Sequence, residues 1–352
     1  MRYILMNKDT KVLFFIPSNS SNFNIEIMGV YNESLVPRPI KSDEDIISWL
    51  LSRLRIINRD DLANTLNYRA EKLQEITELT NFISVTDTYW LQTENQSKHW
   101  SEISPYKNPL NTDIFHNYFE KAITTHGFGV VPFSYRYWHK HNGNICLYKT
   151  GYKDSFVYSE YLVSQLGKYL DFDVVDYQLV TADNTIATVS PCICSEQTGM
   201  YTIKDVRGSI SDIKELFNTD YGEPQHISQR KLIDMVLLDF LTLNIDRNTT
   251  NIGVLFNTDT NELKGIAPLY DFNLTLMSGS NDDDLLCQSL YMGDFKKKYD
   301  KEIEQFRYIL TLDCQYIEQI LNKVSHFTFT GSHSSTANEV LKHQLKLAYT
   351  LL

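Results

Sequence analysis

Apolar positions near the start of the chain fall into two short stretches and then into a helical pattern. Residues 3–6 and 12–16 are mostly apolar and are separated by a polar turn, which predicts two strands. In residues 43–57 and 60–72 apolar positions recur every three to four residues, which predicts two helices. Residues 92–112 are rich in Asn, Ser, Lys and Pro and indicate a connector to the rest of the chain.

The pattern after the connector mixes strands and helices. Ile145, Leu147 and Lys149 alternate with other residues after an Asn-Gly-Asn turn signal, which predicts a strand that carries all three on one face. The expected elements that follow are a helix over 155–170, strands over 173–180 and 185–189, a helix over 231–244, a strand over 251–256, a turn over 257–261 and a return over 266–270. The helix over 231–244 is apolar nearly all round, which predicts that it is buried. The fold class expected from this order is α+β.

Polar residues with the spacing of a phosphotransfer site follow the buried helix. Asp246 and Asn251 have the D-x-x-x-x-N spacing of a kinase catalytic loop, in which the acid orients a hydroxyl and the amide oxygen holds a metal. Asp271 stands at the end of the next predicted strand, where a kinase needs a carboxylate for the ion that bridges the phosphates. A hairpin between these segments would bring both acids to one cleft. The alternative for each acid is an ordinary turn residue.

Lys149 is the remaining charged candidate on an apolar strand. A buried lysine is costly unless it is paired, and Glu160 lies early in the next predicted helix. A strand lysine paired with a helix glutamate is the ion pair that fixes ATP phosphates in kinases. The alternatives are a solubilising lysine at a strand edge and a solvated glutamate. The order of lysine, glutamate, buried helix, D-x-x-x-x-N and strand-end acid favours the functional interpretation.

These motifs resemble the HipA-like kinase family, a divergent branch of the protein-kinase and phosphoinositide-kinase fold. The resemblance runs from Thr124 to Thr275 and is carried by residues 147–151, 159–162, 238–253 and 267–271. It implies a two-lobed kinase-like fold with a small β-rich ATP lobe, a larger helical lobe and a small N-terminal α/β extension. The expected divisions are 1–112 for the extension and connector, 113–200 for the N-lobe and 201–352 for the C-lobe.

The resemblance also implies a role for each candidate. Asp246 would be the catalytic aspartate, Asn251 and Asp271 would bind Mg²⁺, and Lys149 with Glu160 would bind ATP. Gly127 and Gly129 form a Gly-Phe-Gly that is the candidate phosphate loop, with a plain hairpin turn as the alternative. Two departures from the family pattern concern activity: Asn248 replaces the usual His of Asp-Arg-His, and Asn273 falls where relatives have a Ser-Gly pair.

Charge and cysteine content restrict the direct partners and the cellular location that we expect. The chain has 33 basic and 44 acidic residues and a formal charge of −11, which disfavours nucleic acid and anionic membranes as direct partners. Five scattered cysteines argue against a disulfide framework, and no apolar run is long enough to span a membrane, so a cytoplasmic location is expected. Residues 1–112 are interpreted as a partner-binding or substrate-docking extension.

The first hypothesis is therefore an ATP- and Mg²⁺-dependent phosphotransferase, a HipA-like serine/threonine protein kinase with a protein substrate and an antitoxin or regulatory partner. Two alternatives stay open. A pseudokinase-like binding module would keep the fold without the reaction, and a small-molecule kinase would use the same site on a different acceptor.

Overall fold

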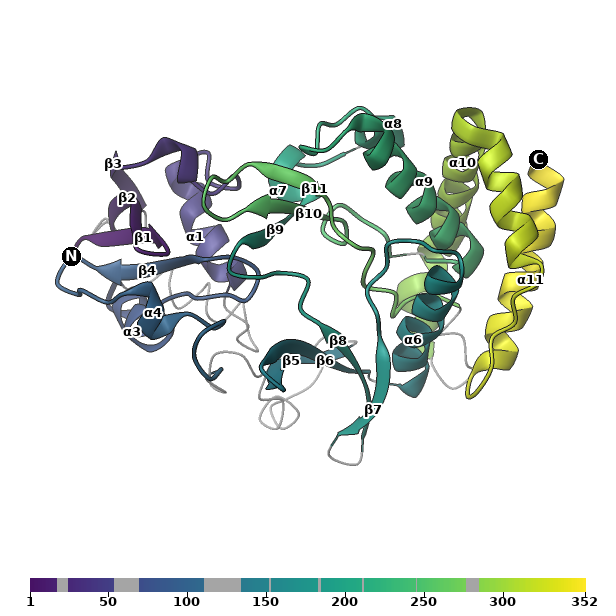
Figure 1. The fold of residues 1–352 in the computed structure, drawn as a ribbon, viewed down its shortest axis with the longest axis horizontal. Helices are drawn as coiled ribbons and strands as arrows, with labels where there is room; N and C mark the ends of the chain where they lie inside the picture. The colour runs from purple at the N-terminus through teal and green to yellow at the C-terminus, as the bar shows by residue number, and fades with distance from the viewer. Residues whose placement is uncertain are drawn as a thin grey trace.

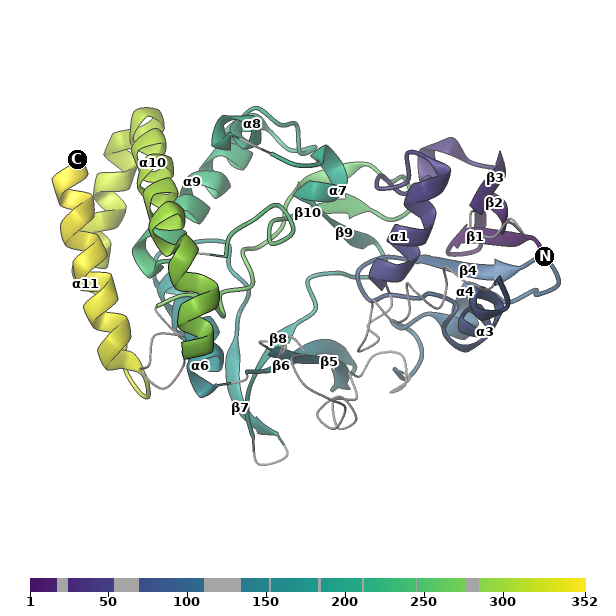
Figure 2. The same cartoon turned by 180° about the vertical axis from the view of Figure 1, so that it is seen from behind.

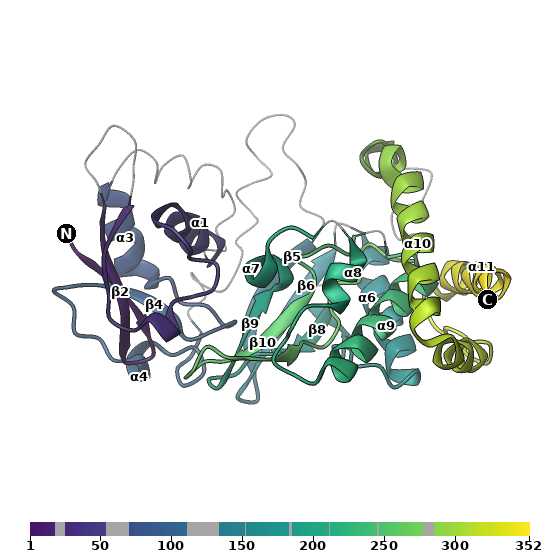
Figure 3. The same cartoon turned by 90° about the horizontal axis from the view of Figure 1, so that it is seen from above.

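The computed structural model describes residues 1–17, 25–53, 70–110, 134–151, 153–182, 185–210, 212–244, 246–276 and 285–352. Three antiparallel sheets and the helices beside them form an α+β architecture (Figure 1). Viewed from above, the N-terminal sheet, the two central sheets and the C-terminal helices follow one another along the molecule (Figure 3). The expected fold class is confirmed.

The N-terminal sheet has the strand order β3-β2-β1-β4. Its strands are β1 (Tyr3–Asn7), β2 (Thr10–Pro17), β3 (Ile25–Val30) and β4 (Tyr89–Thr93), and its helices are η1 (Glu33–Leu35), α1 (Asp43–Arg53) and α3 (Ala70–Thr80). The two strands predicted at the start of the chain and the helix predicted from residue 43 are confirmed. The helix predicted over 60–72 lies largely outside the described residues.

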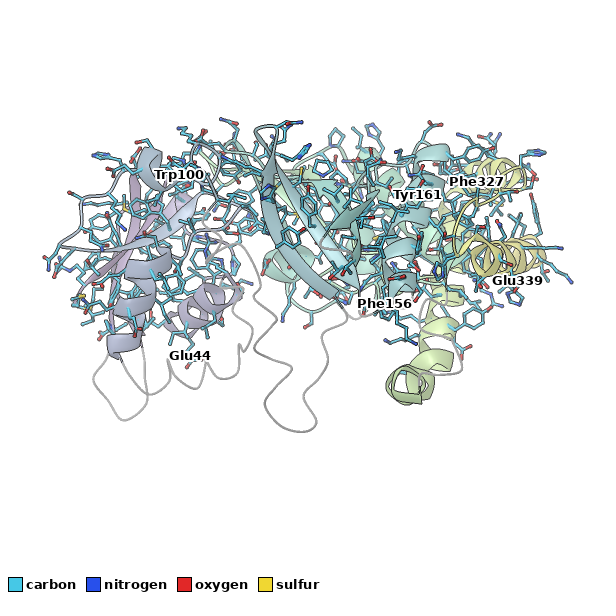
Figure 4. All side chains as sticks on the ribbon, turned by 90° about the horizontal axis from the view of Figure 1, so that it is seen from below. Glu44, Trp100, Phe156, Tyr161, Phe327 and Glu339 are labelled. Atoms are coloured by element: carbon cyan, nitrogen blue, oxygen red, sulfur yellow. The ribbon has the colours of Figure 1, made fainter. Side chains whose placement is uncertain are left out.

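The stretch expected to be a connector is packed into the molecule. It contains α4 (Trp100–Ile103), and Trp100 is buried in one cluster with Trp138 and Ile145 of the next sheet. Figure 4 labels Trp100 where the N-terminal unit meets the following strands. Lys140 also donates from Nζ to the carbonyl oxygens of Tyr106, at 3.0 Å, and Asn108, at 2.6 Å. A polar composition therefore concealed anchoring aromatic residues, while the division at residue 112 stays a prediction.

The second sheet has the order β5-β6-β8-β7 and carries Lys149. Its strands are β5 (Ser134–His141), β6 (Asn144–Gly151), β7 (Gln178–Ala182) and β8 (Thr185–Pro191), and α6 (Asp154–Tyr169) packs against it. The strand predicted over 173–180 begins only at Gln178, and Val174 instead forms a parallel bridge with Leu269. That bridge joins the segment after α6 to the segment that leads to Asp271.

The third sheet has the order β11-β10-β9 and contains the expected hairpin. Its strands are β9 (Thr198–Thr202), β10 (Gly253–Asn257) and β11 (Leu263–Ile266). The return strand predicted over 266–270 ends at Ile266, because Pro268 has no N–H to continue a ladder. Val254 pairs with Ile266, so the segment before β10 and the segment after β11 lie at the same end of the hairpin.

The remaining described elements are helices. They are α7 (Ile203–Arg207), α8 (Ile213–Phe217), α9 (Gln225–Thr242), α10 (Leu285–Val324, with a non-helical break at Asp313) and α11 (Ser334–Leu351). Every residue from Leu232 to Thr242 is buried, as the all-round apolar pattern predicts, and α10 and α11 cover α9 (Figure 2). Among the described helices, none is both long and apolar enough to cross a membrane.

Candidate active site

Lys149 lies between two carboxylates in the interior. Its side chain is 4% exposed, and Nζ donates to Oε1 of Glu160 and, at 2.7 Å, to Oδ1 of Asp271. Thr188 completes the group by donating from its hydroxyl to Oε2 of Glu160 at 3.0 Å. A buried lysine with two carboxylate partners keeps its charge compensated, which offsets part of the cost of removing it from water.

Local structure explains why these residues meet. β6 alternates its side chains, so Lys149 faces inward like Ile145, and α6 begins within a few residues of the strand end. Thr188 is the register partner of Lys149 on β8, which places its hydroxyl beside the ion pair. Sheet register and the short link to α6 thus position both groups that hold Glu160.

The loop after α9 is anchored from inside the helix. Leu243 ends α9 in the left-handed conformation with φ 53°, and the chain then turns back over the buried carboxylate of Asp239. Asp239 accepts from Nδ2 of Asn244 at 2.7 Å and from Nε and Nη2 of Arg247 at 2.8 and 3.0 Å. This two-bond guanidinium–carboxylate pair fixes the start of the predicted catalytic loop.

Arg247 also joins the two segments that carry the proposed metal ligands. Its Nη1 donates to the carbonyl oxygens of Asn251, at 2.7 Å, and Tyr270, at 2.8 Å. Burial alone lowers the pKa of Arg247, but the charge and hydrogen bonds of Asp239 outweigh burial and raise it. A permanently charged guanidinium therefore fixes the backbone next to Asp271 relative to the backbone of Asn251.

Asp246 is half-buried in this loop and faces the same space as Asp271. Nδ2 of Asn251 donates to its carboxylate at 3.2 Å and to its carbonyl oxygen at 3.1 Å. Burial raises the pKa of Asp246, the charge of Asp271 raises it further, and Lys298 and Asn251 act in the opposite direction. The carboxylate of Asp271 thus lies near enough to raise the pKa of Asp246, and a cation between them would relieve the repulsion.

The donors that face this space suit magnesium. Asp271 has a left-handed backbone with φ 63°, and its N–H donates to the hydroxyl of Tyr177 at 3.3 Å. Carboxylate and amide oxygens are hard ligands of the kind Mg²⁺ takes in small number beside substrate phosphates. In the part of the chain that the structure describes, no three His, Cys, Asp or Glu side chains are grouped to hold a metal without such help. The donor set fits an ion that arrives with a polyphosphate.

The structure brings most of the predicted site residues together. Lys149, Glu160 and Asp271 form one buried group, and Asp246 and Asn251 form a second, whose carboxylate is influenced by the charge of Asp271. Asn248 stays within its own loop, donating to the carbonyl oxygen of Asp246 and accepting from Thr250. Asn273 is buried beyond Asp271. Gly127 and Gly129 lie outside the described residues.

Sequence reasoning missed the residues that support the predicted ones. They are Thr188, Tyr177, Asp239, Arg247 and Lys298. Asp239 had a usable signal, because an acid inside a helix that is otherwise apolar all round must be paired. The other contacts depend on tertiary structure and have no local signature.

Comparisons with known proteins show which solved structures have a similar fold. No protein-family model and no curated protein sequence matches the chain. Among solved structures, it is similar to HipA in the Shewanella oneidensis MR-1 toxin–antitoxin complex of HipA, HipB and operator DNA, with a TM-score of 0.57 and 11% identity over 98% of this chain and 96% of that one. It is also similar to CtkA, a proinflammatory kinase of Helicobacter pylori, with a TM-score of 0.45 and 15% identity over 61% of this chain and 93% of that one.

The architecture is that of a two-lobed kinase. More particularly, the chain has a HipA-like kinase fold, as the Shewanella structure shows over nearly the whole length of both chains. The structural match also covers the N-terminal unit, whereas the sequence resemblance begins only at Thr124, because the N-terminal sheet carries no chemical motif. The division of the chain into extension, N-lobe and C-lobe stays a prediction.

Proposed function

We propose that this protein is an ATP- and Mg²⁺-dependent phosphotransferase, a HipA-like serine/threonine protein kinase. The observation that carries the proposal is the burial of Lys149 between Glu160 and Asp271, opposite the loop of Asp246 and Asn251. A HipA-like kinase fold supports the general class, and the residues of this chain support the particular chemistry.

Each residue has a role that follows from its position. Lys149 neutralises charge on the nucleotide phosphates, and Glu160 holds it in place. Asp246 orients the acceptor hydroxyl and takes its proton while the hydroxyl oxygen forms a bond to the γ-phosphorus and the bond to the β,γ-bridging oxygen breaks. Arg247 keeps the loop and the Asp271 segment in register through Asn251 and Tyr270.

Asn251 and Asp271 are the residues that would hold magnesium. The ion, when bound, supplies positive charge against the phosphate oxygens and lessens the repulsion between Asp246 and Asp271. Asn248 braces the loop by hydrogen bonds to Asp246 and Thr250, so its presence in place of histidine is compatible with an ordered catalytic loop. By analogy with the HipA–HipB complex, we propose an antitoxin-like or regulatory protein as a partner.

The decisive experiment compares two variants of the proposed site. Asp246→Ala should reduce phosphate transfer by ~10²–10⁴-fold with ATP binding largely intact, because a positioned acid or base contributes about that factor and Asp246 faces the acceptor. Asp271→Ala should reduce both transfer and Mg²⁺-dependent ATP binding, because it removes a metal ligand. Labelled ATP measures autophosphorylation and hydrolysis, and calorimetry measures binding.

The outcomes separate the classes of function. Wild-type protein that binds Mg²⁺–ATP but transfers no phosphate would be a pseudokinase-like binding module. Transfer to a small-molecule acceptor alone would favour the small-molecule kinase. Full activity in Asp246→Ala would show that the acid is misassigned, and a melting curve unchanged by millimolar Mg²⁺–ATP would remove the nucleotide site altogether.

A further inference from the structure

Three cysteines gather around a pocket away from the proposed kinase site. Cys146, Cys192 and Cys194 all line a pocket of about 570 Å³ beside the β5–β6 turn, and none of Lys149, Asp246 and Asp271 does. The pocket lies along the strand face that carries Cys146 and Tyr148, which alternation places opposite the Lys149 face of β6. Its volume is in the range that accepts small molecules.

Two of these thiols are separated by one residue. Cys192 and Cys194 flank Ile193, where the chain bends directly after β8, and both line the pocket. Cys192 is half-buried, whereas Cys194 is buried. The backbone N–H of Cys192 donates to Ile145 on β6 at 2.8 Å, and its thiol lies 3.6 Å from the carbonyl oxygen of Val85 in the N-terminal unit.

The pair occupies the connection between the two central sheets. β8 carries Thr188, which holds Glu160, and the chain passes through Cys192 and Cys194 before it enters β9. Only Ile193 separates the two cysteines in this bend, and both line the same pocket. Nothing in the proposed phosphotransfer chemistry uses either thiol.

We propose that Cys192 and Cys194 are a thiol–disulfide redox site that takes a small-molecule disulfide, of the glutathione-disulfide class, as its oxidant. Cys192 is the attacking thiol because it is partly exposed in the pocket. Cys194 is the resolving thiol because it is buried one residue away from Cys192, and its pKa is raised by the neighbouring Cys192 and by burial.

The exchange balances in two steps. The Cys192 thiolate, its proton lost to water, forms a bond to one sulfur of the small disulfide, and the S–S bond breaks to release a thiolate that takes up a proton. Cys194 then loses its proton, its sulfur forms a bond to the Cys192 sulfur, and the mixed disulfide breaks to release the second small thiol. The two cysteines are oxidised to a disulfide, and the small disulfide is reduced to two thiols.

Peptide mapping of the full chain tests the site directly. Reduced protein is equilibrated with mixtures of oxidised and reduced glutathione, quenched with acid, alkylated with N-ethylmaleimide and digested with trypsin. Cys192 and Cys194 fall in one tryptic peptide, residues 169–204, with no other cysteine, whereas Cys146 falls in 141–149 and Cys314 in 308–323. The expected result is complete loss of alkylation in peptide 169–204, a mass lower by two hydrogens, and reversal by dithiothreitol.

Three variants test the order of attack. Cys194→Ser should trap glutathione on Cys192, because the resolving thiol is gone. Cys192→Ser should leave the buried Cys194 without a glutathione adduct. Cys146→Ser should leave the bridge unchanged, as the matched control from the same pocket. A bridge from Cys192 to Cys146, or a peptide 169–204 that stays doubly alkylated in every mixture, would overturn the proposal.

Discussion

Asp239 and Asp234 lie on the same buried helix, α9, and meet different partners. Asp239 accepts two hydrogen bonds from the guanidinium of Arg247 and anchors the proposed catalytic loop. Asp234 accepts one hydrogen bond of 2.6 Å from the hydroxyl of Tyr316 on α10. Burial raises the pKa of Asp234 to about 6, against the lowering effects of Tyr316 and Arg230.

Glu302 on α10 extends the contrast. Burial raises its pKa well above the ordinary value, the charge of Asp239 adds to this, and among the described residues its Oε2 has no hydrogen-bond partner. Glu160, Asp271 and Asp239 are thus paired with cations, whereas burial raises the pKa values of Asp234 and Glu302. Cation pairing fixes a geometry at every ordinary pH, and protonation makes the helix packing depend on pH.

The largest loss of stability is expected at the buried ion pair of Arg247 and Asp239. Arg247→Met leaves Asp239 buried and uncompensated and removes the donor to Asn251 and Tyr270, so it should lower the free energy of unfolding by about 3–5 kcal/mol. Urea unfolding measures the change. The double variant Arg247→Met/Asp239→Asn should recover part of it.

A matched control comes from an exposed ion pair between Lys168 on α6 and Asp176 in the segment after it. Lys168 and Asp176 are 41% and 49% exposed, and Lys168→Met should cost no more than about 1 kcal/mol. Equal losses for Arg247→Met and Lys168→Met would contradict the distinction between the paired interior and the surface.

A smaller effect, on the reaction, separates charge pairing from function at Lys149. Lys149→Met should lower turnover by ~10²–10³-fold, as the loss of a preorganised donor does, and should also lower the melting temperature because Glu160 loses its cation. Lys149→Met/Glu160→Gln should regain stability and stay inactive. Recovery of turnover in the double variant would make Lys149 a structural residue only.

The smallest expected effect is a gain in stability on removing the charge of Asp234. The pKa of Asp234 is raised from 3.8 to about 6, so the stability that its proton contributes is fully present below 3.8 and is lost as pH rises through 6. Asp234→Asn keeps an acceptor for Tyr316 without the charge and should gain on the order of 1–3 kcal/mol at pH 8.

Urea unfolding at pH 4 and pH 8 measures this gain. The stabilisation should shrink toward pH 4, where the wild-type carboxyl is protonated as well. The exposed Asp176→Asn serves as the control, with no gain at either pH. A gain of the same size at both values would show that the effect of Asp234 is packing and not ionisation.

Local sequence patterns predicted the local secondary structure and the order of the candidate site residues along the chain. Alternation around Lys149, the all-round apolar helix and the D-x-x-x-x-N spacing depend on neighbours in sequence, and the structure has the strand, the helix and the hairpin they predict. The roles of Asp246, Asn251 and Asp271 stay predictions.

What sequence could not predict depends on chain geometry at single residues. The Asp239–Arg247 pair exists because Leu243 turns back in a left-handed conformation, which an L-residue other than Gly, Asn or Asp rarely adopts. The anchoring of residues 92–110 depends on where Trp100 meets Trp138, far along the chain. Neither contact leaves a periodic signal.

The left-handed backbone at Asp271 has a consequence for how such a chain evolves. A residue with a side chain in that conformation costs on the order of 1 kcal/mol that glycine would not cost. The same carboxylate also compensates the buried charge of Lys149, so glycine at position 271 would relax the backbone and leave that lysine with one carboxylate partner fewer. In a gene copy released from its chemical task, glycine at position 271 is therefore expected to appear together with an uncharged residue at position 149.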